Sequence, residues 1–158
     1  MKKQQSGFTL VELIMVIVVL GILAAFALPR FADFGADARA SSVSGAAGAM
    51  KSAAAIAHSV ALMANPPATG ATGSVTIENE AIGLVNGYPS AAGILIAAQI
   101  SAAAGGANAD YVLASATSPV VIRPKGVSTA NEDNCKITYT EATASAPAKV
   151  EYVNSNCK

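Results

Sequence analysis

Few side chains in this 158-residue sequence are of the kinds that do chemistry. Cys135 and Cys157 are the only cysteines, His58 is the only histidine, and Glu12 interrupts an otherwise apolar run. The sequence contains no GxSxG, HExxH, P-loop or GxGxxG motif, so no nucleophile, metal-bound base or phosphate cradle is indicated. We therefore predict that the protein is not an enzyme and has no cofactor.

A metal site finds little support in the same residues. Two cysteines and one histidine are too few for the four ligands of a structural zinc site. Residues 131–134, Asn-Glu-Asp-Asn, are rich in oxygen, which makes Glu132 and Asp133 weak candidates for calcium. Calcium sites use spaced ligands, however, and four adjacent polar residues are more typical of a solvated turn. We expect no resident metal.

Charge and hydropathy exclude further classes. Lys+Arg and Asp+Glu number 10 each, whereas nucleic-acid modules cluster basic residues, so no nucleic-acid partner is expected. Charged residues are 13% of the chain, about half the ~25% of ordinary soluble domains. Apolar residues reach 53%, and the mean hydropathy is +0.46. This chain is too apolar for an ordinary cytosolic protein.

The hydrophobicity is concentrated near the amino end. Residues 8–28 would span about 31 Å as a helix, which matches the apolar core of a bilayer. Lys2 and Lys3 precede this run and keep the amino end in the cytoplasm by the positive-inside rule. The sequence therefore predicts a membrane-spanning helix, with the chain beyond Pro29 exported.

An ordinary secretory signal peptide is the alternative interpretation. The Ala-Phe-Ala triplet at residues 25–27 would be the cleavage site, and a monomeric secreted binding domain would begin near Leu28. Glu12 argues against this, because a carboxylate in an apolar stretch costs roughly 2.5–3.5 kcal/mol on insertion scales. A disposable signal gains nothing from that cost. Pro29, two residues after the triplet, also disfavours cleavage there.

Residues 7–12, Gly-Phe-Thr-Leu-Val-Glu, follow a short basic leader, and the apolar run continues to Pro29. This pattern resembles the prepilin signal of type IV pilins and type II secretion pseudopilins. The resemblance implies cleavage by prepilin peptidase between Gly7 and Phe8, and N-methylation of Phe8. It also implies that Glu12 stays in the mature protein.

Glu12 then needs a positive partner, because a buried carboxylate is stable only when paired. The α-amino group of a processed Phe8 supplies that charge. It does not easily reach Glu12 of its own helix, whereas it reaches Glu12 of a neighbouring subunit staggered along a filament. We predict a homo-oligomeric helical filament held in part by this pair.

Helical periodicity continues past Pro29 and predicts an amphipathic helix that ends near Ala64. Gly21 and Pro29 are the predicted kink positions. The predicted organisation is a cleaved leader, a transmembrane and filament-core helix, its amphipathic continuation and a globular domain, over residues 1–7, 8–28, 29–64 and 65–158.

The globular domain is predicted to contain a loop, one short helix and an antiparallel sheet. Residues 65–89 are predicted as loop with a short strand at 75–77. Ser90 is a predicted N-cap for a helix over residues 91–104. About four strands then pack on the first helix, which makes the fold class α+β; they cover residues 111–114, 119–123, 135–140 and 149–153.

In an exported protein, Cys135 and Cys157 predict one disulfide. This layout also resembles that of type IV pilins, which have a disulfide-bounded region near the carboxyl end. The order of residues 87–90 (Gly-Tyr-Pro-Ser), a short helix and the Cys135–Cys157 segment is similar to major pilins of the mannose-sensitive haemagglutinin (MSHA) class. The cysteine pair favours a pilin over a pseudopilin, which shares the amino end and is the alternative.

The resemblance also implies a location and partners. The prepilin would reside in the inner membrane of a Gram-negative bacterium, where prepilin peptidase and the pilus assembly machinery act on it. The mature chain would then become the major subunit of an extracellular pilus, or fimbrium. Surface adhesion and biofilm attachment are the implied outputs, with motility where the pilus retracts; the sequence does not indicate the adhesive ligand.

Overall fold

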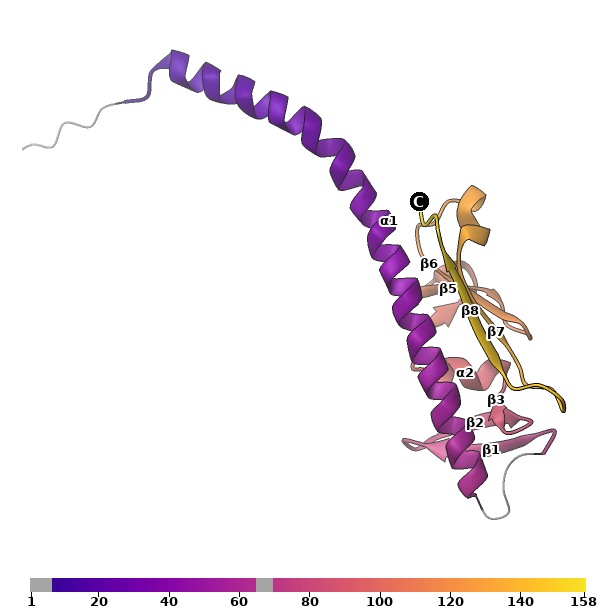
Figure 1. Ribbon diagram of the computed structural model, residues 1–158. Coiled ribbons are helices and arrows are strands. Elements are labelled where there is room, and N and C mark those ends of the chain that lie inside the picture. Colours follow the sequence, from indigo (N-terminus) through magenta and orange to yellow (C-terminus); the bar gives the residue numbers. More distant parts are fainter. Residues whose placement is uncertain (1–6, 65–69) are drawn as a thin grey trace, which may run out of the picture. The chain divides into compact units, whose positions relative to one another are not determined.

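The computed structural model describes residues 7–64 and 70–158 (Figure 1). It divides into two compact units, residues 1–35 and Ala36–Lys158, and the first helix, α1 (Leu10–Met63), contributes to both. The helix runs through Gly21 and Pro29 without a break in its secondary structure; a kink at these residues stays a prediction. The observed end at Met63 agrees with the predicted one, and residues 65–69 lie outside the described part.

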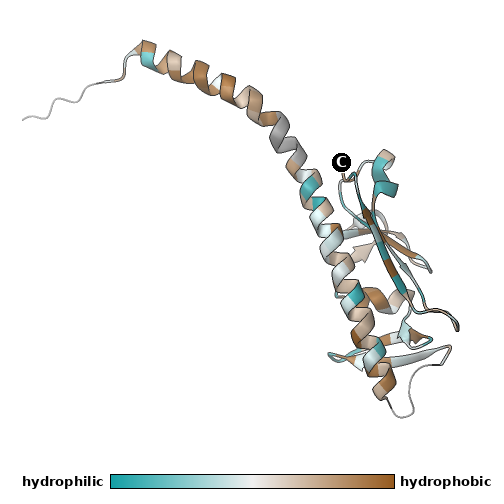
Figure 2. Cartoon of the chain, in the orientation of Figure 1, coloured by the Kyte–Doolittle hydropathy of each residue, from teal (hydrophilic) through white to brown (hydrophobic). Residues whose placement is uncertain are grey.

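In the first unit, none of the described side chains of α1 is buried. Leu10–Leu28 has the length and composition to cross a membrane, and none of it is buried within the chain. In Figure 2, the ribbon of this stretch is coloured mostly in the browns of hydrophobic residues. A helix that is apolar all round is stable only when lipid or other helices cover it. Phe34–Met63 passes the same length test, but a third of it is buried.

The second unit contains a five-stranded sheet that packs on the later turns of α1. The order β4-β5-β6-β7-β8 is antiparallel except for β4, which runs parallel to β5. The four predicted strands are confirmed, and the two-residue edge strand β4 is an addition. The strands are β4 (Ala102–Ala103), β5 (Tyr111–Ser115), β6 (Val120–Pro124), β7 (Cys135–Thr140) and β8 (Lys149–Asn154).

The core lies between this sheet and α1. Ile137 and Tyr139 of β7 are fully buried and alternate with less buried residues, as a strand with one covered face requires. They meet Val43 and Ala47 of α1, whose small side chains allow close approach of helix and sheet. The Tyr139 hydroxyl donates to the Pro89 carbonyl oxygen at 2.5 Å, and burial raises the pKa of Tyr139, so the phenol stays protonated.

The short strand predicted at residues 75–77 is confirmed, whereas the loop predicted over the rest of the described part of residues 65–89 is wrong. A second, three-stranded antiparallel sheet is formed by β1 (Gly73–Ile77), β2 (Glu80–Val85) and β3 (Tyr88–Pro89). Each turn holds two residues at positive φ, Glu78 and Asn79 in the first and Asn86 and Gly87 in the second. Two-residue turns of this kind suit β-hairpins, and Asn-Gly is a strong hairpin signal. A second apolar cluster joins this sheet to the last turns of α1; it contains Ala57, Ala61, Val75, Ile82 and Leu84.

Helix α2 (Ala91–Ala97) is shorter than predicted. Its start is correct, because the Ser90 hydroxyl caps it by accepting from the Gly93 N–H at 3.1 Å. The predicted extension to residue 104 is wrong, since Gln99 takes a left-handed conformation (φ 52°) and turns the chain away from the helix. The residues beyond form β4 and the 3₁₀ turn η1 (Ala104–Gly106), and a second 3₁₀ helix, η2 (Thr129–Asn134), precedes β7.

Candidate functional site: the amino end of the first helix

The amino end of α1 is closed by a pair of reciprocal hydrogen bonds between Thr9 and Glu12. Thr9 Oγ1 accepts from the Glu12 N–H at 3.2 Å. In return, Glu12 Oε2 accepts from the Thr9 N–H at 2.9 Å and from the Thr9 hydroxyl at 2.8 Å. This arrangement is a capping box, which satisfies backbone donors that a helix start otherwise leaves open. The Thr-x-x-Glu spacing that signals it is present in the sequence, although our sequence analysis did not use it.

The cap gives Glu12 a role within its own helix. In an apolar medium, open N–H groups and a bare carboxylate are both unfavourable, and the capping box satisfies one with the other. A negative charge in the first turn is also favoured by the helix dipole. Both bonds go to Oε2, and no donor among the described residues reaches Oε1. The carboxylate can therefore keep its cap and still accept from a further partner.

Gly7 and Phe8 lie immediately before this cap, outside the helix. A Cβ placed on Gly7 would meet nothing within 4 Å, and the Phe8 side chain is 90% exposed. The bond between these residues is therefore accessible, as processing by a peptidase requires. A new amino terminus at Phe8 would stand directly before the capping residue Thr9.

Behind the cap, α1 presents large apolar side chains on all sides. Together with Phe8 just before the cap, fifteen large apolar side chains between residues 8 and 28 are exposed; they are Phe8, Leu10, Val11, Leu13, Ile14, Met15, Val16, Ile17, Val18, Val19, Leu20, Ile22, Leu23, Phe26 and Leu28. A Cβ at Gly21 would meet nothing within 4 Å, so this glycine is a notch in the apolar surface that no residue of its own chain fills. Notches of this kind let helix backbones approach closely.

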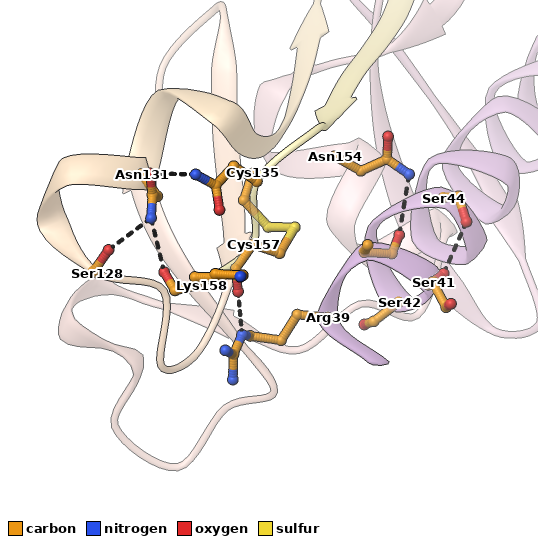
Figure 3. Close-up of a disulfide and its surroundings, with 12 residues drawn as sticks. Arg39, Ser41, Ser42, Ser44, Ser128, Asn131, Cys135, Asn154, Cys157 and Lys158 are labelled. Atoms are coloured by element: carbon orange, nitrogen blue, oxygen red, sulfur yellow. Dashed lines mark hydrogen bonds between the residues drawn. A yellow bond between two sulfur atoms is a disulfide. The ribbon is translucent and has the colours of Figure 1, made fainter. Parts of the chain in front are cut away.

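The disulfide lies at the opposite end of the sequence, in the second unit (Figure 3). Cys135 and Cys157 are bonded, which confirms the prediction, and their Cα atoms are 5.0 Å apart. Both residues are buried in the core. Arg39 of α1 donates from Nε to the Cys157 carbonyl oxygen at 2.6 Å, and the Ser128 N–H donates to the carbonyl oxygen of Lys158 at 2.9 Å. The carboxyl-terminal segment is thus tied to both the helix and η2.

The two weak calcium candidates already have cationic partners. Glu132 forms an ion pair with Arg123, and Asp133 pairs with Lys136 at 2.6 Å. This lysine holds the pKa of Asp133 below its usual value. Among the described residues, no three His, Cys, Asp or Glu side chains gather as a metal site would need. The geometry therefore gives the calcium interpretation no support.

Residues 2–28 match the prokaryotic N-terminal methylation motif. The match covers the basic leader, the capping box and the exposed apolar stretch of α1.

Similar full-length proteins are pilus and fimbrial subunits. The chain is 52% identical over 52 residues to "Type IV narrow pilus major component PilA5" of Thermus thermophilus, across 33% of this chain and 45% of that protein. It is 47% identical over 53 residues to "Fimbrial protein EcpC" of Eikenella corrodens, across 34% and 35%. It is 34% identical over 93 residues to "Type IV major fimbrial protein FimA" of Dichelobacter nodosus, across 58% and 57%.

The chain therefore matches less than two thirds of the length of these curated relatives. No solved structure gave a significant match.

Proposed function

We propose that this protein is the major subunit of a type IV pilus and that it polymerises through α1 into an extracellular filament. The observation that carries the proposal is the methylation motif on a helix that, with Phe8 before it, has fifteen large apolar side chains which the described residues leave exposed. A bilayer covers them before assembly, and identical helices cover them afterwards. The protein acts by assembly rather than by catalysis.

The first step in this proposal is cleavage between Gly7 and Phe8 by prepilin peptidase, followed by N-methylation of Phe8. The open space around Gly7 and the non-helical backbone before the cap support it. Cleavage removes Lys2 and Lys3, which hold the amino end at the cytoplasmic face of the inner membrane. The capping box survives, because Thr9 and Glu12 both lie in the mature chain.

The second step is pairing of the Phe8 amino group of one subunit with Glu12 of another. The Oε1 atom, which the cap leaves open, supports this pairing. A contact between different surfaces of identical subunits repeats from one subunit to the next, and it produces a fibre when its rotation does not close a ring. Gly21 provides a place where a neighbouring helix can approach closely.

We further propose that the filament is of the MSHA-like type, in a Gram-negative bacterium, and that it serves adhesion and biofilm attachment. The support is the arrangement of residues 87–90, α2 and the Cys135–Cys157 loop. Surface attachment sensitive to free mannose would be the expected property of filaments of this type.

Mass spectrometry of sheared surface filaments tests the main proposal. We expect subunits that begin with N-methylated Phe8 and contain the intact disulfide. A mature chain that begins at Leu28 would indicate a signal peptidase substrate and overturn the proposal. Absence of this chain from surface filaments, with correct processing at Phe8, would indicate a periplasmic pseudopilin instead.

A further inference from the structure

A groove of about 440 Å³ lies in the second unit, lined by residues of α1, β3 and β8 and of the segment just before β8. This volume is within the ~300–1,000 Å³ range of small-ligand sites. Ala54, Ala148 and Val150 line it with short apolar side chains, so part of its lining, called here the alanine floor, is apolar. None of these residues belongs to the exposed stretch of α1 on which assembly depends.

Two lysines from different elements border the groove, Lys51 of α1 and Lys149 of β8. Lys149 is paired with Glu151 at 2.7 Å. Lys51 has no carboxylate partner among the described residues, and its Nζ lies 5.7 Å from the centre of the Tyr152 ring. From residue 36 onward the sequence has seven Lys+Arg and eight Asp+Glu, so this groove is locally positive on a unit that is slightly acidic.

One wall of the groove is a stacked pair of rings, His58 and Tyr88. Their centroids are 4.0 Å apart and their planes differ by 6°. His58 Nδ1 is 2.8 Å from the Gly87 carbonyl oxygen, which can only accept, so Nδ1 is the donor and Nε2 remains open. The neighbouring Ser59 hydroxyl donates to the Ala55 carbonyl oxygen at 2.9 Å, which leaves its lone pairs available. The wall is held in place from within the protein and still offers polar atoms.

We propose that this groove binds a sugar acid, a pyranose that carries a carboxylate. The ammonium groups of Lys51 and Lys149 hold the carboxylate, and the alanine floor takes the apolar face of the ring. His58 Nε2 and the Ser59 hydroxyl bond to ring hydroxyls. This site goes beyond the proposed function, because neither processing nor polymerisation through α1 requires it.

Isothermal titration of the processed full-length chain in non-ionic detergent tests the site, with glucuronate as the probe. We expect weak binding that weakens further as NaCl is added, because the lysines are exposed. Lys51→Met should lower the affinity by roughly fivefold or more, since it removes the cation that lacks a carboxylate partner. The matched control is Lys125→Met, an exposed lysine outside the groove, which should leave the affinity unchanged.

Three comparisons can overturn the site. Equal binding of glucose would remove the role of the lysines, and equal binding of acetate would remove the role of the sugar ring. Absence of glucuronate binding at about 10 mM, beyond the usual range of specific ligands, would remove the site altogether. Filament yield is measured in parallel: Lys51→Met should assemble normally, and its failure to assemble would mark the groove as a subunit contact instead. None of these results bears on the processing of Phe8, so the site and the proposed function fail separately.

Discussion

Substitutions at Thr9 and Glu12 separate the role that the Glu12 carboxylate has in the helix cap from its proposed role as a charge partner. Thr9→Val removes the hydroxyl that exchanges hydrogen bonds with Glu12 but keeps the charge. Glu12→Gln keeps an oxygen that can accept from Thr9 but removes the charge. Glu12→Val removes both. These three variants therefore isolate each role within the first turn of α1.

The expected magnitudes differ. Loss of a capping hydroxyl destabilises a helix by about 1 kcal/mol, which is roughly a fivefold change in an equilibrium constant. Loss of one partner of a buried ion pair costs about 3–5 kcal/mol, which is a factor of roughly a hundred to several thousand in an equilibrium constant. We therefore expect Thr9→Val to assemble with moderately reduced yield, and Glu12→Gln and Glu12→Val to assemble poorly. Glu12→Val should nevertheless remain inserted in the membrane, because it removes the only charge from the apolar run.

The assay compares sheared filaments with the membrane-bound pool of each variant by quantitative immunoblot, at matched expression. Mass spectrometry of the membrane pool confirms that each variant is cleaved before Phe8, so a loss of filaments reflects assembly. Normal yield from Glu12→Gln together with loss of filaments in Thr9→Val would refute the charge pairing. It would leave the cap as the whole role of Glu12.

Three further predictions concern the second unit. Replacement of Cys135 and Cys157 by serine should lower the free energy of unfolding by about 3 kcal/mol, because the disulfide closes a loop across a sequence separation of 22. Denaturant titration of the full-length chain in detergent measures this free energy. Gly93→Ala should destabilise the fold by about 1–3 kcal/mol in the same titration, because the new Cβ would collide with the Gly83 carbonyl oxygen. The control is Gly48→Ala, whose Cβ would meet open space on the helix, so it should stabilise the fold slightly. The pKa of Asp133 is lowered in the folded chain. Its stabilising contribution is therefore present above the pKa of the unfolded state and disappears as the pH falls through the pKa of the folded state. Asp133→Asn should remove that part of the dependence of stability on acid pH, and an unchanged pH profile would contradict this prediction.

The parts of the fold that sequence reasoning predicted correctly are those with strong periodic patterns. Ile137 and Tyr139 alternate with polar neighbours along a strand, and the alanine stripe of α1 recurs at helical spacing. Of the small sheet, the sequence predicts only the strand at residues 75–77, because Asn86 and Gly87 are typical of loops as well as of hairpin turns. The turn at Glu78 and Asn79 gives a weaker signal, since neither residue is glycine.

At the amino end, the sequence predicts the processing motif but not the hydrogen bonds of the helix cap. Gly7, Phe8 and Glu12 were identified from the leader and from a carboxylate in an apolar run. The prediction for Glu12 considers only its charge, and it leaves out the hydrogen bonds that Glu12 forms with Thr9 three residues earlier. The proximity of Lys51 and Lys149 is not predictable from the sequence, because these residues belong to elements about a hundred residues apart.

The cap at Glu12 and the exposed apolar stretch together explain how one helix can suit two surroundings. Fifteen large side chains, more than half exposed on average, represent on the order of 15 kcal/mol of burial per subunit when other helices cover them. Lipid covers them equally well, so this apolar surface alone does not favour the filament over the membrane. In the proposed assembly, the two states differ at Glu12 Oε1, which no donor among the described residues reaches and which would gain a cation from a neighbouring processed Phe8. The capping box would keep the helix end satisfied in both states, and the proposed charge pair would give assembly its direction and its dependence on cleavage at Gly7.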